Sequence, residues 1–195
     1  IGSRYRGFDA HALSYESVWD ADPVASLMRR VVRDLVASHL VAGSAVLDVG
    51  CGPGVDAAWL VEAGHRVLAL DASPAMAAAA RRRVAGLDAR LLRAEDVGQV
   101  AKEGPFDMAL LDFGVANCVD LWALCAGLRR CIRPGGVVVL VVMPRVHPSW
   151  MARELLRRRP RGALARLQRR LSVPVSGAPV AVRYFGAATV QRAFE

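Results

Sequence analysis

Three aspartates of this chain lie at the ends of short apolar runs, and a glycine-rich turn follows the first of these runs. The aspartates are Asp48, Asp71 and Asp112, and the turn spans residues 50–54. In open α/β sheets, ligands bind beyond the carboxyl ends of the strands, where the strand order reverses. If the apolar runs are strands of such a sheet, the three carboxylates meet at one edge and favour a cationic ligand.

The turn reads Gly50-Cys51-Gly52-Pro53-Gly54, and its glycines permit positive φ angles and a close approach of the backbone to a ligand. A dinucleotide-binding turn has the different spacing G-x-G-x-x-G and holds a pyrophosphate at a helix N-terminus. Asp48, two residues before the first glycine, would repel that pyrophosphate. A phosphate-binding P-loop is excluded because no Gly-Lys-Ser/Thr follows the turn.

Strand-like and helix-like segments alternate up to residue 143. Strands are expected at 45–49, 66–70, 89–92, 106–111 and 137–142. Helices are expected at 23–41, where Asp22 is a suitable N-cap, and at 55–63, 74–84, 97–102 and 119–131. This alternation predicts an α/β fold, a three-layer sandwich whose mostly parallel, doubly wound sheet is covered by helices on both faces.

The remainder of the chain is arginine-rich. Residues 150–171 are expected to form a helical stretch broken by Pro160 and Gly162, 173–185 a hairpin or loose strand pair, and 187–194 the start of a helix. The arginine cluster 153–170 is compatible with the backbone of a nucleic acid, with an anionic membrane surface, or with an ordinary solvated helix face. The solvated face is the default interpretation because interleaved aromatic residues are absent.

Composition narrows the class of protein. The chain is 54% hydrophobic, which excludes a disordered chain, and its longest strongly apolar run, 137–143, is too short to span a bilayer. We find no signal peptide, and the four cysteines show no CxxC pair. These observations predict a cytoplasmic protein without a metal site. The net charge of +8 comes with a single lysine, Lys102, and such heavy arginine use is typical of a GC-rich, hence bacterial, genome.

Five segments together resemble the motifs of class I S-adenosylmethionine-dependent methyltransferases, in that family's order and spacing. The segments are 46–54 (VLDVGCGPG), 68–76 (LALDASPAM), 94–96 (AED), 106–114 (FDMALLDFG) and 133–136 (RPGG). The resemblance covers roughly residues 8–143. It implies a Rossmann-like methyltransferase fold, S-adenosyl-L-methionine as cofactor and S-adenosyl-L-homocysteine as product.

The resemblance also implies roles for individual residues. Asp48 and the glycine turn would border the methionine end of the cofactor, Asp71 the ribose hydroxyls, and Asp112 with Phe113 the methionine portion and the acceptor. The cofactor-binding residues implied are Tyr15, Asp48, Gly50, Cys51, Gly52, Gly54, Asp71, Ala72, Ala94, Glu95, Asp112 and Phe113. In two places this chain departs from the family, because Arg93 stands where many relatives have an acidic residue and Asp112 replaces an Asn or Ser.

The acceptor is left open between classes. The Asp/Asn-Pro-Pro-Tyr/Phe motif of nucleobase amino methyltransferases is absent, and the segment 111–114 (LDFG) stands in its place. We therefore expect a small-molecule acceptor, with O-, N- or C-methylation unresolved; the alternatives are an RNA-directed methyltransferase and a non-catalytic cofactor-binding scaffold. No catalytic residue is assigned. His147 is a candidate general base, although a lone histidine in a proline-flanked loop is more often structural. The oligomeric state is not predicted.

The resemblance divides the chain into three parts. Residues 1–44 would form an N-terminal lid and helix, 45–143 the cofactor-binding core, and 144–195 a basic substrate cap followed by the start of a truncated C-terminal part. The family sheet has seven strands, and only five are identified here. We therefore expect strands six and seven to be missing, which would leave the apolar fifth strand as an exposed edge.

Overall fold

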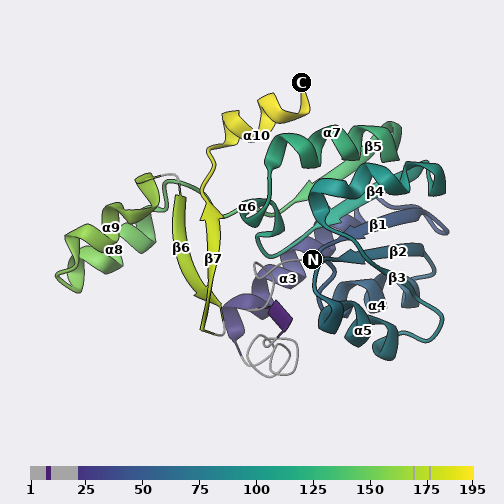
Figure 1. Ribbon diagram of the computed structural model, residues 1–195, viewed down its shortest axis with the longest axis horizontal. Coiled ribbons are helices and arrows are strands. Elements are labelled where there is room, and N and C mark those ends of the chain that lie inside the picture. The colour runs from purple at the N-terminus through teal and green to yellow at the C-terminus, as the bar shows by residue number, and fades with distance from the viewer. Residues whose placement is uncertain (1–7, 10–21, 169, 176) are drawn as a thin grey trace.

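In the computed structural model, residues 8–9, 22–168, 170–175 and 177–195 are described. Five parallel strands form the central sheet in the order β3-β2-β1-β4-β5 (Figure 1). The strands are β1 (Ala45–Val49), β2 (Arg66–Asp71), β3 (Asp88–Leu91), β4 (Phe106–Leu111) and β5 (Ile132–Leu140). The predicted parallel, doubly wound sheet is confirmed, with the strand order reversing between β1 and β4.

The register of the strands brings their carboxyl ends together. Val49 of β1 lies opposite Leu70 of β2, and Asp48 lies opposite Leu110 of β4. Asp71 ends β2, and Asp112 directly follows β4. The three aspartates therefore lie at one edge of the sheet, beside the point where the strand order reverses, which is where such sheets bind ligands.

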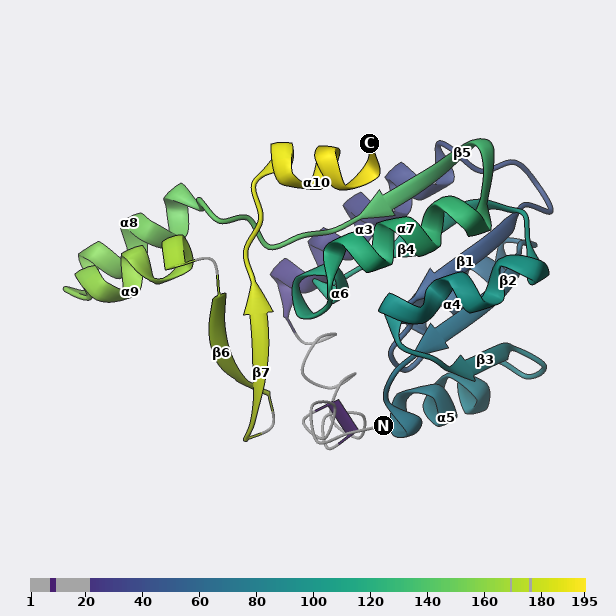
Figure 2. The ribbon, with the colours of Figure 1, turned by 45° about the horizontal axis from the view of Figure 1, so that its top comes forward.

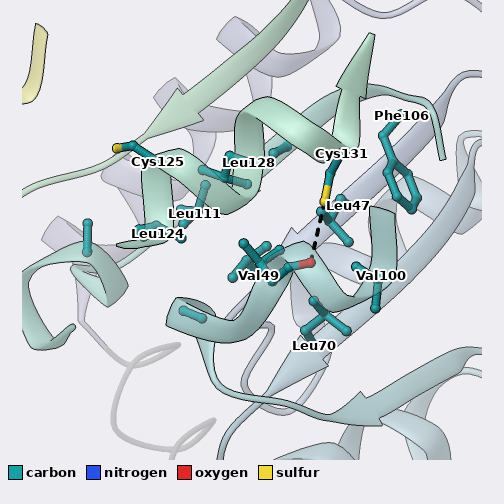
Figure 3. Close-up of a cluster of buried hydrophobic side chains, with 14 of the residues drawn as sticks. Leu47, Val49, Leu70, Val100, Phe106, Leu111, Leu124, Cys125, Leu128 and Cys131 are labelled. Atoms are coloured by element: carbon teal, nitrogen blue, oxygen red, sulfur yellow. Dashed lines mark hydrogen bonds between the residues drawn. The ribbon is translucent and has the colours of Figure 1, made fainter. Parts of the chain in front are cut away.

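Helices cover both faces of the sheet (Figures 1 and 2). On one face lie α3 (Pro23–Ala37), α4 (Val55–Glu62) and α5 (Pro74–Arg83); on the other lie η2 (Ala94–Glu103), α7 (Leu121–Cys131) and α10 (Ala187–Phe194). Because side chains alternate across a strand, Leu47 and Val49 face α7 while Val46 faces α3. Figure 3 shows Leu124 and Leu128 of α7 packed against strand residues.

Local capping explains several helix boundaries. Asp22 accepts a hydrogen bond from the Val24 amide (2.8 Å), as predicted, and Ser73 accepts one from the Met76 amide (3.1 Å) at the start of α5. The helix predicted at 119–131 begins instead at 121, because Asp120 is its N-cap and accepts from the amides of Trp122 and Ala123. A separate short helix, α6 (Val115–Cys118), precedes it.

The chain after β5 forms an arm and a hairpin. The helices α8 (Pro148–Leu156) and α9 (Pro160–Leu164) and the 3-10 helix η3 (Ala165–Gln168) lead into β6 (Arg170–Val175) and β7 (Ala178–Arg183). These two strands pair antiparallel, with Leu171 opposite Val182. The hairpin predicted at 173–185 is thus present, beginning a few residues earlier.

The prediction that strands six and seven are missing is wrong. A sixth and a seventh strand exist, but they form a two-stranded sheet of their own and do not extend the five-stranded sheet. The tight turn at Gly177, with φ +80°, lets the chain pair with itself locally. The family pattern places strands six and seven in the large sheet, so this separate hairpin was not counted as those two strands. Within the described part of the chain, β5 is the last strand of the large sheet.

One buried asparagine fastens the hairpin to the core. The side chain of Asn117 in α6 donates to the carbonyls of Met143 and Arg183 and accepts from the Met143 amide (2.8 Å). On the inner face of the hairpin, Val180, Val182 and Tyr184 form a cluster with neighbouring apolar side chains. The hairpin therefore sits beside the end of β4.

No described helix combines the length and the apolar character that crossing a bilayer requires.

Candidate functional site

Two buried carboxylates define the centre of the candidate site. Asp48 is 3% exposed and Asp112 is 9% exposed. Asp112 Oδ1 accepts from the Phe113 amide at 2.6 Å. Within the described residues, the Oδ2 atoms of both aspartates are buried without a hydrogen-bond partner. A buried carboxylate oxygen without a partner is costly, so these two atoms indicate a place for a donor or a cation.

The electrostatics agree with this interpretation. Burial raises the pKa of Asp48 well above its ordinary value, and the nearby carboxylates of Asp56, Asp112 and Asp71 raise it further. Burial likewise raises the pKa of Asp112 to about 6, against the hydrogen bond from the Phe113 amide. The site therefore holds an excess of negative charge in a desolvated place, and a cation bound there would restore the ionised carboxylates.

The glycine turn lies directly beside these carboxylates, and two of its glycines are required by packing. A Cβ on Gly50 would lie 2.4 Å from a methyl carbon of Val115, and one on Gly54 would lie 2.9 Å from the Ala80 backbone. Gly52, with φ +54°, faces open space, and its amide donates to Asp71 Oδ2 at 2.9 Å. The turn is therefore packed on one side and open on the other.

Cys51 is part of the turn but is not set up as a nucleophile. Its amide donates to the Leu70 carbonyl at 3.0 Å, and its side chain is buried. Burial raises the pKa of the thiol well above its ordinary value, with Asp48 and Asp71 adding to the shift. The thiol is therefore protonated at neutral pH, and the residue serves the shape of the turn.

Asp71 is held in a fixed orientation at the end of β2. Its Oδ2 accepts from the Gly52 amide, and its Oδ1 accepts from the Ser73 amide at 2.8 Å. Burial raises the pKa of this carboxyl, and the backbone hydrogen bonds oppose the increase. Each oxygen keeps a second lone pair, so a bidentate contact with two hydroxyls remains geometrically open. Ala72, next in the chain, is half-buried at the same edge.

The predicted adenine contacts begin η2. Ala94 is buried in the core cluster under α7, and Glu95 is half-buried beside it. Arg93, the residue that departs from the family pattern, forms an ion pair with Asp96 at 2.6 Å. Of the two acidic residues that follow Arg93, Asp96 is thus engaged by that arginine. Burial raises the pKa of the Cys118 thiol, and Glu95 lies close enough to add to this increase.

Two arginines of α3 border the site, and the sequence analysis did not identify them. Arg33 Nε lies 2.8 Å from Asp56 Oδ1, and Arg29 Nε lies 3.5 Å from Asp56 Oδ2. The Arg29 guanidinium also lies over the Phe113 ring, 5.0 Å from its centroid. The signal in the sequence was their spacing, because positions 29 and 33 are about one helical turn apart, on the face of α3 that holds its buried residues. The structure shows the result, since only 8% of Arg29 is exposed.

One residue of the predicted lid, Asp9, and two candidate site residues, Tyr15 and His147, have not yet been located. Asp9, in the predicted lid, accepts from Ser73 Oγ at 2.5 Å, so this part of the lid touches the start of α5 beside Asp71. Tyr15 lies outside the described residues. His147 is the N-cap of α8, and its Nδ1 faces the Trp150 amide (3.3 Å) and Ser149 Oγ (3.2 Å). His147 thus caps the helix of the arm.

Comparison with known proteins agrees with the geometry. Residues 46–136 match the family described as "Methyltransferase domain". Residues 46–136 are thus similar to a methyltransferase domain, as the resemblance to class I S-adenosylmethionine-dependent methyltransferases implied. This domain holds all the strands of the parallel sheet up to the start of β5, together with the glycine turn and the three aspartates.

The relatives extend the comparison beyond this methyltransferase domain. The malonyl-[acyl-carrier protein] O-methyltransferase of Salmonella typhimurium is 36% identical over 114 residues, covering 56% of this chain and 45% of the relative. The ubiquinone biosynthesis O-methyltransferase of Xanthomonas oryzae is 31% identical over 142 residues, covering 68% and 58%. The chain thus spans about half the length of the curated relatives it matches. The solved DhpI–SAH complex has the same fold, with a TM-score of 0.65, 20% identity and coverage of 97% of this chain and 83% of that one.

Proposed function

We propose that the chain binds S-adenosyl-L-methionine at the carboxyl edge of its parallel sheet and transfers the methyl group to a small-molecule acceptor. The observation that carries the proposal is the pair of buried Oδ2 atoms of Asp48 and Asp112, which have no hydrogen-bond partner among the described residues and lie beside the open side of the glycine turn. When bound, the cofactor supplies an electrophilic methyl group on a positively charged sulfur. The residues present therefore fit the group.

Each residue of the site has a definite part in this proposal. Asp48 and Asp112 would face the positively charged methionine end, and their desolvation makes them sensitive to charge. The open side of Gly52 would give backbone access, and Asp71, held by two amides, would accept the ribose hydroxyls. Further cofactor contacts are assigned to Tyr15, Gly50, Cys51, Gly54, Ala72, Ala94, Glu95 and Phe113.

The three-part division of the chain is retained as part of the proposal. Residues 45–143 would bind the cofactor, and within the proposed cap 144–185 the hairpin, attached through Asn117 beside the end of β4, would be the part that covers the acceptor. Exclusion of water and alignment of the acceptor would be the main tasks of that cap, because methyl transfer is an in-line displacement. No general base is assigned, since His147 caps a helix.

The relatives favour a small-molecule acceptor over the alternatives. Their names specify malonyl-[acyl-carrier protein] and ubiquinone biosynthesis, and a further relative from Clavibacter sepedonicus is a demethylmenaquinone methyltransferase. An RNA-directed methyltransferase, considered from the charge alone, is not favoured. The acceptor atom and the exact acceptor stay open.

Titration calorimetry with S-adenosyl-L-methionine and S-adenosyl-L-homocysteine tests the proposal. Asp71→Ala should weaken the binding of both ligands, whereas Asp48→Asn should weaken binding of the cationic methionine form more than that of the neutral-sulfur product. A charged hydrogen bond contributes roughly 1.5–3 kcal/mol, so a loss of about tenfold to a hundredfold is expected. Asp34→Asn, which removes an exposed carboxylate of α3, is the matched control. Full affinity in Asp71→Ala, or equal losses for both ligands in Asp48→Asn, would contradict the assignment.

A further inference from the structure

The positive charge of the chain is confined to one segment. Residues 144–185 contain ten arginines and one acidic residue, Glu154, whereas the rest of the chain contains sixteen basic and seventeen acidic residues. The net charge of +8 therefore resides entirely in this segment, and the remainder is close to neutral. A general bias toward arginine would raise the net charge along the whole chain. Outside this segment, however, acidic residues balance the basic ones, so the excess is specific to the segment.

The single acidic residue of the segment is withdrawn from its surface. Glu154 is buried between α8 and α9, where a Cβ on Gly162 would lie 2.7 Å from Glu154 Oε2. Arg157 lies 3.8 Å from the other carboxylate oxygen. Among the described charged side chains of the helical arm, defined here as residues 148–168, those that are exposed are thus all positive: Arg153, Arg157, Arg158, Arg159 and Arg161.

The arm stands away from the rest of the molecule. Figures 1 and 2 both show α8 and α9 at the far end of the structure, separated from the parallel sheet by the β6–β7 hairpin. The chain reverses between α8 and α9 at Arg158, which has φ +57°. The arm therefore projects from the rest of the molecule.

Leucines are exposed on this arm next to the arginines. Leu156 is 85% exposed, Leu155 is 56% exposed and Leu164 is 53% exposed. Leu155 and Leu156 end α8 immediately before the run Arg157 to Arg159. Basic side chains around exposed leucines on a short helix are the pattern of segments that lie at a membrane interface, with the apolar side chains below the headgroups and the arginines level with them.

Two other kinds of partner fit these observations less well. The backbone of a nucleic acid would engage the arginines but offers nothing to exposed leucines. An acidic protein partner would need a pocket that matches the projecting arm, whereas the surface of a bilayer adapts to it. We propose that the arm binds anionic lipid surfaces. This binding is independent of the methyl-transfer function and is measured without the cofactor.

Vesicle co-sedimentation of the whole chain tests the proposal. The probes are vesicles of phosphatidylcholine alone and vesicles in which a third of the lipid is phosphatidylglycerol. We expect binding to the anionic vesicles only, weakened by added salt because the headgroup attraction is screened. Equal binding to both vesicle types, or binding to neither, would overturn the proposal.

Matched variants separate the arm from the overall charge. The triple variant Arg153→Gln, Arg159→Gln, Arg161→Gln should lose roughly a hundredfold in affinity, because each arginine near an anionic surface contributes about fivefold. The control triple, Arg30→Gln, Arg82→Gln, Arg129→Gln, removes the same charge from exposed positions elsewhere and should retain the affinity. Equal losses in the two triples would overturn the proposal in favour of a nonspecific charge effect.

The leucines distinguish the class of partner. Leu155→Ser with Leu156→Ser should lower vesicle affinity by at least tenfold, since each buried methylene contributes about fourfold; Val41→Ser with Leu91→Ser, also exposed, is the control pair. Single-stranded RNA and polyglutamate are tested in parallel. A lipid surface would be refuted as the partner if the protein binds RNA or polyglutamate but not vesicles, and if the two leucine substitutions leave that binding unchanged. Circular dichroism of every variant verifies that the fold is retained.

Discussion

Asp112→Asn is expected to make the free protein more stable while weakening cofactor binding. Asn keeps an Oδ1 for the Phe113 amide and mimics the protonated carboxyl, but it removes the buried charge. In the wild type, the pKa of Asp112 is raised from 3.8 to about 6 by burial, so the folded state binds this proton more tightly than the unfolded state does. The stability that this proton provides is lost as the pH rises from 3.8 through about 6.

The magnitude follows from the two pKa values. Over the whole transition the carboxylate costs the folded state about 3 kcal/mol, at 1.36 kcal/mol per pKa unit. Part of this loss has already occurred at about pH 5, and the advantage of the Asn variant should therefore grow by about 1.4 kcal/mol between about pH 5 and pH 8. Removal of the charge also relieves Asp48, whose pKa is raised in part by Asp112, and this adds to the same trend.

Urea unfolding of the wild type and of Asp112→Asn at both pH values is the assay. Comparing the variant with the wild type at each pH removes the contribution of all other titrating groups. Asp34→Asn, at an exposed position, should show no such growth between the two pH values. A variant that is less stable than the wild type at pH 8, with no change in the difference across pH, would refute the reasoning. It would mean that the carboxylate already has a stabilising partner in the free protein.

Three other changes probe the packing around the site. Gly50→Ala should cost about 2–4 kcal/mol in chemical denaturation, because its Cβ would strike Val115 at a φ of +77°; a double variant with Val115→Ala that recovers nothing would contradict the clash. Asn117→Ala should cost about 2–3 kcal/mol and expose the hairpin to proteases, because three partly buried backbone groups of Met143 and Arg183 lose their partner; an equally protected hairpin would contradict the role of Asn117 in attaching it. Arg33→Met should raise the pKa of Asp112 further, since Arg33 lowers it, as measured by NMR titration of the carboxyl; a lower pKa would contradict the assigned interaction with this arginine.

Local features of the sequence were enough to predict the parallel sheet and the place of the site. Short, nearly continuous apolar runs mark the strands, and caps such as Asp22 and Ser73 act within a few residues of the helix ends, so both can be recognised without a structure. The glycine spacing and the aspartates at strand ends follow from the same local pattern. The boundaries were less predictable, as at Asp120, where a cap was counted as part of its helix.

Contacts between distant segments were beyond the sequence. Arg33 meets Asp56 across 23 positions, and Arg29 covers Phe113, because α3 packs beside α4 on one face of the sheet. The hairpin of β6 and β7 was predicted, but the conclusion that strands six and seven are missing was wrong, because whether a strand joins a large sheet or pairs with its neighbour depends on where the chain lies in space.

The sequence by itself determined which groups are chemically available: three carboxylates at strand ends, an open glycine turn and an excess of arginine after residue 143. Only the tertiary structure decided their state. In the part of the chain that the structure describes, burial left one oxygen of Asp48 and one of Asp112 without partners, and the packing of α9 on α8 buried Glu154, the one acidic side chain of the arm. The physical reason is that desolvation depends on everything packed around a group, and residues far away in the sequence supply most of that surrounding.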